Sequence, residues 1–336
     1  MQQRARLQLQ KMSKSKLSTL SQSKFLRRIV GRPFLRVNEF AWKRLPASVR
    51  TLQPVVRYGV FLNSLVKLRS NRNQVHGTFF LRNRPELELI RSLAERKPKG
   101  SNLKLTVLAC SNGAEVYSHV WFIRSARPDL KLEVFAIDIS EVIVKIASEG
   151  VCSLGENALV YERILARMSE KEIDAMFDRE GDHVRVKSWI AEGIHWFAGD
   201  AGDPRLAETV GPADIVIANK FLCHMHPPDA ERCLRSLPRW VKPGGHLLVS
   251  GVDLEVRAKV AADLGWIPLL DQIGEIHDGD PSVRRDWPWR YWGLEPFDAT
   301  RPDWQMRYAA AFEIGVLGYR TASSYTIVQS ATSIAD

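Results

Sequence analysis

A loop of small residues and two nearby acids are the part of this sequence best suited to chemistry. The loop 109–115 reads ACSNGAE, and its small side chains would let a ligand approach the backbone closely. Asp138 lies 25 residues after Gly113, where an acid can accept hydrogen bonds from both hydroxyls of a ribose. Glu115 can pair with an ammonium group. Either acid alone is more often a surface residue, and their joint placement is what favours a ligand site.

The glycine pattern of this loop limits the kind of nucleotide that it can hold. The full G-x-G-x-x-G fingerprint, which cradles a pyrophosphate, is missing. Its absence disfavours a nicotinamide or flavin and suits a ligand with a ribose and an adenine but no pyrophosphate. S-adenosyl-L-methionine is such a ligand, and its amino-acid end carries an ammonium that Glu115 can bind. We therefore expect S-adenosylmethionine as the cofactor.

The elements that must position these residues alternate between strands and helices. Short apolar runs predict strands, and longer runs with mixed three- and four-residue spacing predict helices. The strands are expected at 103–110, 132–138, 213–219 and 246–250, and the helices at 50–67, 114–125, 141–148, 228–241 and 254–264. This alternation predicts an α/β, Rossmann-like fold with a doubly wound, mostly parallel sheet. The tail, 309–317 and 324–329, is expected to close the sheet as an antiparallel hairpin.

Positive charge is concentrated at the start of the chain. Residues 1–75 hold 17 of the 48 Lys and Arg but only one acid, Glu39, so they carry about +16 and the remainder about −6. We therefore divide the chain into a basic extension, 1–75, which is disordered or helical, and a catalytic domain, 76–336. The extension suits a solvated arm, an amphipathic surface helix or a transit peptide, and its charge suits a membrane surface or nucleic acid.

Composition also limits location and metal content. No apolar run reaches the roughly 18–20 residues of a membrane span. The four cysteines have no metal or redox spacing, so we expect reduced thiols in a cytoplasmic protein, with the inner membrane surface as a further location. His224 and His226 could form half a metal site, but no further ligand has matching spacing, and no metal is predicted.

Five stretches, in order, resemble one known family. They are TFFLR at 78–82, ACSNGAEVYS at 109–118, AIDI at 136–139, the segment 184–200 with its run IHWF, and ANK at 218–220 followed by KPGG at 242–245. They are similar to motifs of the CheR-type chemoreceptor methyltransferases. The resemblance covers roughly residues 76–252, about half of the chain.

The resemblance implies a class I methyltransferase that uses S-adenosylmethionine and forms a methyl ester on a glutamate of an acidic protein. It implies that Arg82 and Tyr117 are catalytic. It also implies a cofactor site made of His76, Thr78, Arg82, Ala109, Ser111, Gly113, Glu115, Asp138, Asp200, Ala201, Asn219 and Lys220.

Some positions depart from the family's pattern and bear on the substrate. Lys220 stands where an apolar residue is usual, and Cys223-His224-Met225-His226 replaces the usual aromatics. A hydroxyl or amine acceptor would have to lose a proton, and His224 or His226 would then be the candidate base. A methyltransferase for a small molecule or nucleic acid, or a non-catalytic cofactor-binding regulator, are the alternatives.

An aromatic-rich segment near 280–305 has no counterpart in the family's usual short C-terminus. Residues 286–304 hold four of the ten tryptophans. We expect this segment to contact the substrate as a lid, through Arg290 and Trp292. The alternative is a structural patch packed on the domain.

Overall fold

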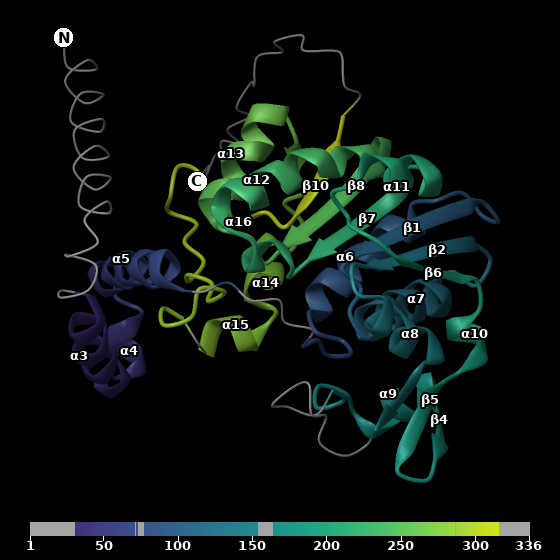
Figure 1. Cartoon of the computed structure of the whole chain (residues 1–336), viewed down its shortest axis with the longest axis horizontal. Coiled ribbons are helices and arrows are strands. Elements are labelled where there is room, and N and C mark those ends of the chain that lie inside the picture. Colours follow the sequence, from purple (N-terminus) through teal and green to yellow (C-terminus); the bar gives the residue numbers. More distant parts are fainter. Residues whose placement is uncertain (1–30, 71, 73–76, 154–163, 286, 316–336) are drawn as a thin grey trace, which may run out of the picture.

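A seven-stranded sheet forms the centre of the protein (Figure 1). The structure is a computed structural model that describes residues 31–70, 72, 77–153, 164–285 and 287–315. The strand order is β6-β2-β1-β7-β8-β10-β9, and the first five strands run parallel. The bounds are β1 Asn102–Leu108, β2 Lys131–Asp138, β6 Ile194–Ala198, β7 Ala213–Asn219, β8 Val241–Ser250, β9 Ile267–Pro268 and β10 Ala311–Ile314. The predicted doubly wound, mostly parallel α/β sheet is confirmed.

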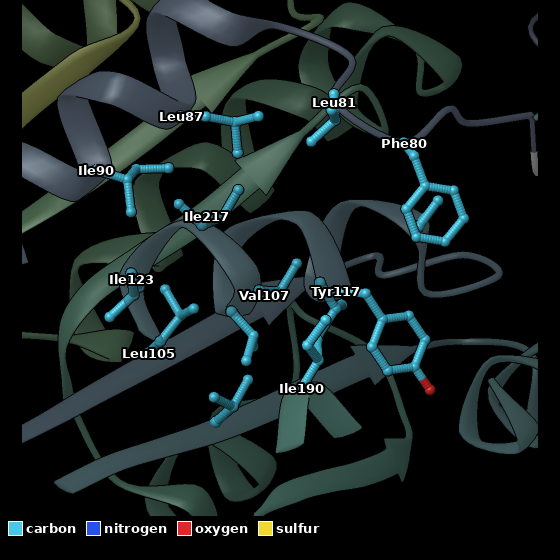
Figure 2. Packing of buried hydrophobic residues seen from close by; sticks show 14 of the residues in the cluster. Phe80, Leu81, Leu87, Ile90, Leu105, Val107, Tyr117, Ile123, Ile190 and Ile217 are labelled. Atoms are coloured by element: carbon cyan, nitrogen blue, oxygen red, sulfur yellow. The ribbon is translucent and has the colours of Figure 1, made fainter. Parts of the chain in front are cut away.

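Helices cover both faces of this sheet because alternate strand residues enter two separate cores. Leu105 and Val107 face one core, with helices α6 and α7, whereas Val216 and Ala218 face the other, with α12 and α13. Figure 2 shows the first core, where Ile90 of α6 and Ile123 of α7 pack over β1. The helix bounds are α6 Arg84–Glu95, α7 Ala114–Ala126, α8 Glu141–Glu149, α11 Pro204–Val210, α12 Pro227–Ser236 and α13 Leu254–Leu264.

Strand β8 differs from its expected bounds. It begins at Val241, five residues before the expected His246, and runs through the Lys-Pro-Gly-Gly turn. The register shifts between Ala213 and Ile215 of β7, so the extra residues form a bulge in the ladder rather than a loop outside it. The helix before it ends at Ser236, and a 3-10 turn, Leu237–Trp240, follows.

A small antiparallel sheet, which the sequence analysis missed, is inserted between α8 and β6. Its strands are β3 Val151–Ser153, β5 His183–Val186 and β4 Phe177–Glu180, accompanied by the helices α9 Glu170–Met176 and α10 Ser188–Ala191. Figure 1 shows it projecting at the edge of the molecule beyond α8.

Three N-terminal helices form a separate cluster at the other side of the molecule (Figure 1). They are α3 Gly31–Arg44, α4 Ala47–Arg50 and α5 Gln53–Arg69, so the helix expected at 50–67 is present. Trp42, Val56 and Leu62 of this cluster are buried together with Trp287 from the C-terminal segment. Within the described residues, no helix combines the length and apolar character needed to cross a bilayer.

The C-terminal segment contains the short helices α14 Ile273–Asp278, α15 Pro281–Arg285 and α16 Trp304–Tyr308, and then β10. Strand β10 is antiparallel to both β8 and β9, so the first half of the expected closing hairpin does extend the sheet. Its neighbour is β9 at 267–268, which comes earlier in the chain. The expected second half, 324–329, lies outside the described residues.

Candidate active site

A cavity of about 270 Å³ lies at the carboxyl ends of β1, β2 and β7. This is the edge at which ligands bind in open α/β sheets. Ten residues expected at the cofactor site line it: Thr78, Arg82, Ala109, Ser111, Glu115, Asp138, Asp200, Ala201, Asn219 and Lys220. The lining also includes residues that the sequence analysis did not assign to the cofactor: Gly77, Ile139, Gly199, Phe221, His224 and Met225.

Unusual backbone conformations are concentrated around this cavity. Of the five non-glycine residues with positive φ in the described chain, Ala109, Ser111 and Lys220 line the cavity and Leu81 precedes Arg82. Residues other than glycine rarely adopt a positive φ, and those that do cluster at functional sites. The turn at Lys220 also needs a glycine beside it, because a Cβ on Gly251 would lie 2.5 Å from the Cα of Lys220.

The carboxylate of Asp138 is fixed by two backbone amides. Its Oδ2 accepts from the N–H of Ser111 at 2.9 Å and its Oδ1 from that of Ser140 at 3.1 Å. Each oxygen keeps acceptor capacity for a ligand hydroxyl. Nearby, the buried Oγ1 of Thr78 has no hydrogen-bond partner among the described residues. Both features suit the polar edge of a nucleoside.

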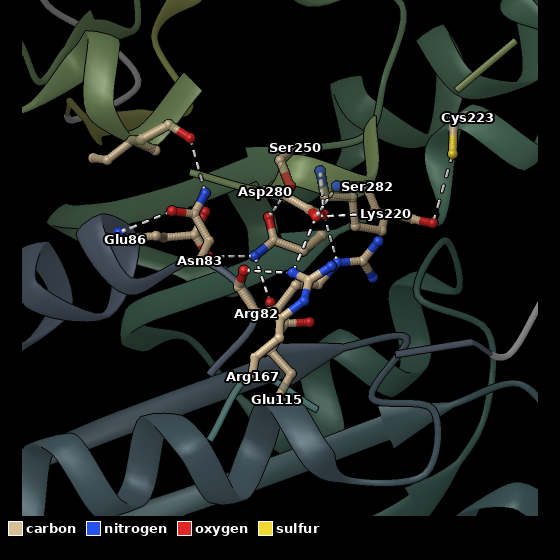
Figure 3. Close-up of polar contacts among 12 residues, drawn as sticks. Arg82, Asn83, Glu86, Glu115, Arg167, Lys220, Cys223, Ser250, Asp280 and Ser282 are labelled. Atoms are coloured by element: carbon tan, nitrogen blue, oxygen red, sulfur yellow. Dashed lines mark hydrogen bonds and ion pairs between the residues drawn. The ribbon is translucent and has the colours of Figure 1, made fainter. Parts of the chain in front are cut away.

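A second cluster joins two carboxylates through one amide (Figure 3). The Nδ2 of Asn219 donates to Glu86 at 2.6 Å and to Glu115 at 2.7 Å, and its Oδ1 accepts from Ser250 at 2.7 Å. His119 is buried beside them. Neither of its ring nitrogens has a hydrogen-bond partner among the described residues, and its Nε2 is 3.6 Å from Glu115. Glu86, Glu115 and His119 also lie close enough together to bind a cation.

The two carboxylates of this cluster differ in charge. Burial, together with the neighbouring Glu115, raises the pKa of Glu86 to about 7. Burial alone would also raise the pKa of Glu115, but His119, Asn219 and Arg82 outweigh it, and its pKa is lowered. Glu115 is therefore the ionised member, and the cluster can bind an ammonium group. His119 was not predicted from the sequence, although its position one helical turn after Glu115 on α7 could have indicated that the two side chains are neighbours.

Asp280 is a buried anion shared by three cations (Figure 3). Arg82 Nε donates to it at 2.7 Å, Arg167 Nη1 at 3.1 Å, and Lys220 Nζ lies 3.6 Å away. Ser282 Oγ donates to it at 2.6 Å. Burial would raise the pKa of Asp280, but Lys220, Arg82 and Ser282 outweigh it and hold the pKa well below its usual range.

The cations around Asp280 respond to burial in different ways. Burial lowers the pKa of Lys220 despite Asp280, whereas for Arg82 the ion pair with Asp280 outweighs burial and raises the pKa. Three cations therefore contact this carboxylate, and two of them, Arg82 and Lys220, line the cavity. Neither Asp280 nor Arg167 was predicted as a site residue from the sequence, because neither belongs to a local motif.

The segment after β7, at the edge of the cavity, is held by Arg72, which follows the N-terminal helix α5. Arg72 donates to the carbonyl oxygens of Cys223, at 3.3 Å, and Met225, at 2.8 Å, and pairs with Asp253 at 3.0 Å. His224 lines the cavity, and its Nδ1 lies 2.7 Å from the hydroxyl of Tyr291. His226 instead stands at the N-cap position of α12, where its side chain makes no capping hydrogen bond, and it is not part of the lining.

Two residues expected at the site have structural roles instead. Tyr117 is buried, its hydroxyl donates to the carbonyl of Ala147 at 2.6 Å, and its ring packs against Trp196. It braces α7 against α8 and is not part of the cavity lining, so its expected catalytic role has no geometric support. Gly113 caps α7 with a φ of +84°, a conformation that favours glycine. His76 lies outside the described residues.

The aromatic segment, expected to contact the substrate as a lid, packs against the N-terminal helices. Trp287 packs against Trp42, and Asn63 of α5 donates to the carbonyls of Pro288, at 2.9 Å, and Arg290, at 3.0 Å. Arg290 is exposed and its guanidinium lies 5.3 Å from the ring of Trp292; neither residue lines the main cavity. The segment joins the N-terminal helices to the domain, and Tyr291 is its link to the cavity, through His224.

Known proteins resemble this chain over the same region. The family model of the CheR methyltransferase SAM-binding domain matches residues 76–258. Chemotaxis protein methyltransferase 2 of Vibrio cholerae is 21% identical over 62% of this chain and 68% of its own length. An uncharacterized 104.1 kDa protein of Rhodobacter capsulatus is 24% identical over 59% of this chain, which spans only 22% of that protein.

Among solved structures, PKMT2 of Rickettsia typhi in complex with AdoHcy is similar over 51% of this chain and 25% of its own, with 16% identity and a TM-score of 0.30. All four cysteines are free thiols.

The cavity thus combines three features within the region that the family model covers. Asp138 can accept hydrogen bonds from a ribose, the cluster around Asn219 can bind an ammonium group, and Arg82 and Lys220 are cations in the lining.

Proposed function

Since the chain belongs to the CheR methyltransferase family and is an S-adenosylmethionine-dependent methyltransferase, we propose that its methyl acceptor is a carboxylate. In this proposal the carboxylate is the side chain of a glutamate in an acidic protein. The observation that carries the proposal is that two cations, Arg82 and Lys220, line the cavity and pair with the same buried carboxylate, Asp280.

The residues of the cavity fit the cofactor at its ribose and at both charged groups of its amino-acid end. Asp138 would hold the ribose hydroxyls, and Glu115 with Asn219 would hold the ammonium. Arg82 would hold the cofactor carboxylate, with Thr78 as a further polar contact. When bound, S-adenosylmethionine supplies an activated methyl group on a positively charged sulfur.

The charges that remain after the cofactor is bound favour an anionic acceptor. Glu115 and Asp138 are both assigned to the cofactor, and Arg82 is matched by its carboxylate. Lys220 and Arg167 then share Asp280, and Glu86 is a further acid close to Lys220. A carboxylate acceptor would be attracted to Lys220, which lines the cavity.

A carboxylate acceptor also asks little of the protein in chemical terms. Its pKa of about 4.3 leaves it ionised at neutral pH, so no base has to remove a proton. Orientation of the acceptor by Lys220 is then the main contribution, and positioning can lower a barrier by up to roughly 7–11 kcal/mol. The ester product is neutral and loses its attraction to Lys220, which helps it to leave.

A second candidate is a hydroxyl or amine acceptor, because His224 lies in the cavity lining. Such an acceptor must lose its proton, and an imidazole is the usual base for that step. His224 would then be required for turnover, whereas a carboxylate acceptor does not require it.

The two candidates are separated by labelling a lysate of the source cells with methyl-labelled cofactor. A carboxylate acceptor gives protein-bound label that mild alkali releases as methanol, and an amine acceptor gives label that alkali leaves in place. We expect Lys220→Met to lower kcat/KM for the acceptor by about 10- to 100-fold, the value of one charged contact, with cofactor Kd nearly unchanged. Lys259→Met, an exposed lysine on α13, is the matched control. Alkali-stable label that disappears in His224→Gln would overturn the carboxylate proposal.

A further inference from the structure

The N-terminal helices present large apolar side chains to solvent. On α3, Val37 is 67% exposed and Phe40 is 60% exposed. On α5, Tyr58, Phe61 and Leu68 are 41%, 43% and 61% exposed. These five residues define the outer face of the cluster. Scattered apolar residues on a surface are ordinary, but large ones gathered on two adjoining helices mark an interaction site.

Helix periodicity places the α5 residues in one stripe. Positions 58, 61, 65 and 68 follow three- and four-residue spacing. The opposite face of α5, including Val56, Gly59 and Leu62, is buried against Trp42 and Trp287. The outer stripe therefore cannot turn inward without exposing the inner one.

The α3 and α5 residues belong to one continuous surface. The hydroxyl of Tyr58 donates to Oδ1 of Asn38 at 2.6 Å, and this contact joins the outer stripe of α5 to the neighbour of Val37. The rings of Tyr58 and Phe61 stack with centroids 6.1 Å apart. Phe40 lies one helical turn after Val37 and extends the apolar surface along α3.

Cationic side chains surround these apolar ones. Residues 31–70 contain eight Lys and Arg and a single acid, Glu39, which is already paired with Lys43 at 2.7 Å. The guanidinium of Arg44 lies 3.3 Å from the centre of the Phe40 ring. Arg36 and Arg57 are exposed beside Val37 and Tyr58 in the sequence.

We propose that this outer face binds the surface of an anionic lipid bilayer. Aromatic and aliphatic side chains insert at the headgroup level, while arginines attract anionic headgroups. Binding to a nucleic acid would use the charges and leave Phe40 and Phe61 without a role. An acidic helical partner would dock its apolar side into a groove, whereas here the apolar side chains protrude from two helices.

Flotation of the full-length protein with vesicles tests the proposal. The protein should float with vesicles of phosphatidylcholine plus phosphatidylglycerol, and much less with phosphatidylcholine alone. The double variant Phe40→Ser/Phe61→Ser should lower the partition coefficient at least about tenfold, because insertion is lost. The matched control is Val142→Ser/Ile146→Ser on α8, whose side chains are 69% and 40% exposed outside this face.

A charge pair of variants tests the electrostatic half. Arg44→Glu/Arg57→Glu should abolish the preference for phosphatidylglycerol, whereas Arg205→Glu, with its side chain 89% exposed on α11, should leave it unchanged. Circular dichroism confirms that each variant is folded. Lack of vesicle binding, or binding unaffected by Phe40→Ser/Phe61→Ser, would overturn the proposal. Binding to DNA or to an acidic protein without any binding to vesicles would identify the other partner class.

Discussion

Asp280 sets the charge of the candidate active site at the level of a single residue. The buried carboxylate faces Arg82, Arg167 and Lys220, and replacing it with an amide would leave three cations around a neutral group. Leaving a buried charge without its partner typically costs about 3–5 kcal/mol of stability. Arg82 and Lys220 would also lose the contact that orients them toward the cavity.

Asp280→Asn should therefore raise the acceptor KM and lower stability together. Burial already lowers the pKa of Lys220 and Asp280 opposes that effect, so the amide should lower it further. The alkaline limb of the pH profile of kcat/KM for the acceptor should move to lower pH. Asp271→Asn, whose side chain is 72% exposed, is the control. An unmoved pH profile in a folded Asp280→Asn protein would show that Asp280 does not act on Lys220.

Glu86 predicts a pH dependence of cofactor binding. Its pKa of about 7 is raised chiefly by burial and further by Glu115. An ammonium bound beside Asn219 favours ionised Glu86, so cofactor affinity should rise by up to about tenfold between about pH 6 and about pH 8. Glu86→Gln should bind with a flatter pH dependence in calorimetry. An equally steep rise in this variant would assign the effect to another group.

The same residue has the opposite effect on stability. Its pKa in the folded state lies above its ordinary value, so the stability that protonated Glu86 contributes is present at acid pH and is lost as pH rises through about 7. Glu86→Gln should therefore gain stability relative to the parent protein on the alkaline side.

At the scale of elements, α5 packs against the domain where its backbone at Gly59 contacts the ring of Trp287. Gly59 has no side chain, and a Cβ there would lie 2.3 Å from Trp287 and 2.7 Å from Trp42. Gly59→Ala should lower the free energy of unfolding by about 1–3 kcal/mol through overpacking, partly offset by better helix propensity. Urea unfolding measures this, with Gly315→Ala as the control, because a Cβ there would meet no atom of the described residues within 4 Å. No loss of stability would mean that α5 and Trp287 can separate freely.

Local pattern was sufficient to predict the central strands of the main sheet, but the edge strands β6 and β9 were not predicted. β1 and β7 are mostly apolar runs buried on both faces, β2 alternates between buried and exposed residues at its start, and α13 has the expected bounds of 254 to 264. Helix α6 was missed although its signals are present: Asn83 caps it, Pro85 stands in its first turn, and apolar residues follow at helical spacing. The strands of the small sheet have only three or four residues each. β5, HVRV, does alternate between polar and apolar residues, but so short a run is a weak signal.

The cavity residues divide in the same way. Glu115, Asp138 and Asn219 could be predicted because each belongs to a motif at a strand end. Asp280 could not, because its partner Arg82 is 198 positions earlier in the chain. The role of Trp287 was missed for the same reason, since nothing near it in the sequence indicates contact with Trp42.

At the scale of the whole molecule, the described N-terminal helices contribute no residue to the cavity lining. The first described residue of that lining is Gly77, and α3 begins at Gly31. Removing residues 1–30 should therefore leave cofactor Kd unchanged within about twofold, a change of under 1 kcal/mol. A larger deletion through Trp42 would expose Trp287 and is not equivalent. Calorimetry on the shortened protein tests this, and a large loss of affinity would place residues 1–30 at the site.

The position of Asp280 limits how this enzyme can be dissected or recombined. The family model ends at residue 258, yet Asp280, the shared counter-ion of Arg82 and Lys220, lies beyond that boundary. A fragment trimmed to the family boundaries would retain both cations and lose their anion. A chimera that grafts another member's C-terminus onto this core would face the same deficit unless the donor brings an acid to that point. The functional module is therefore longer than the region that the family model matches, because it has to include the carboxylate of Asp280.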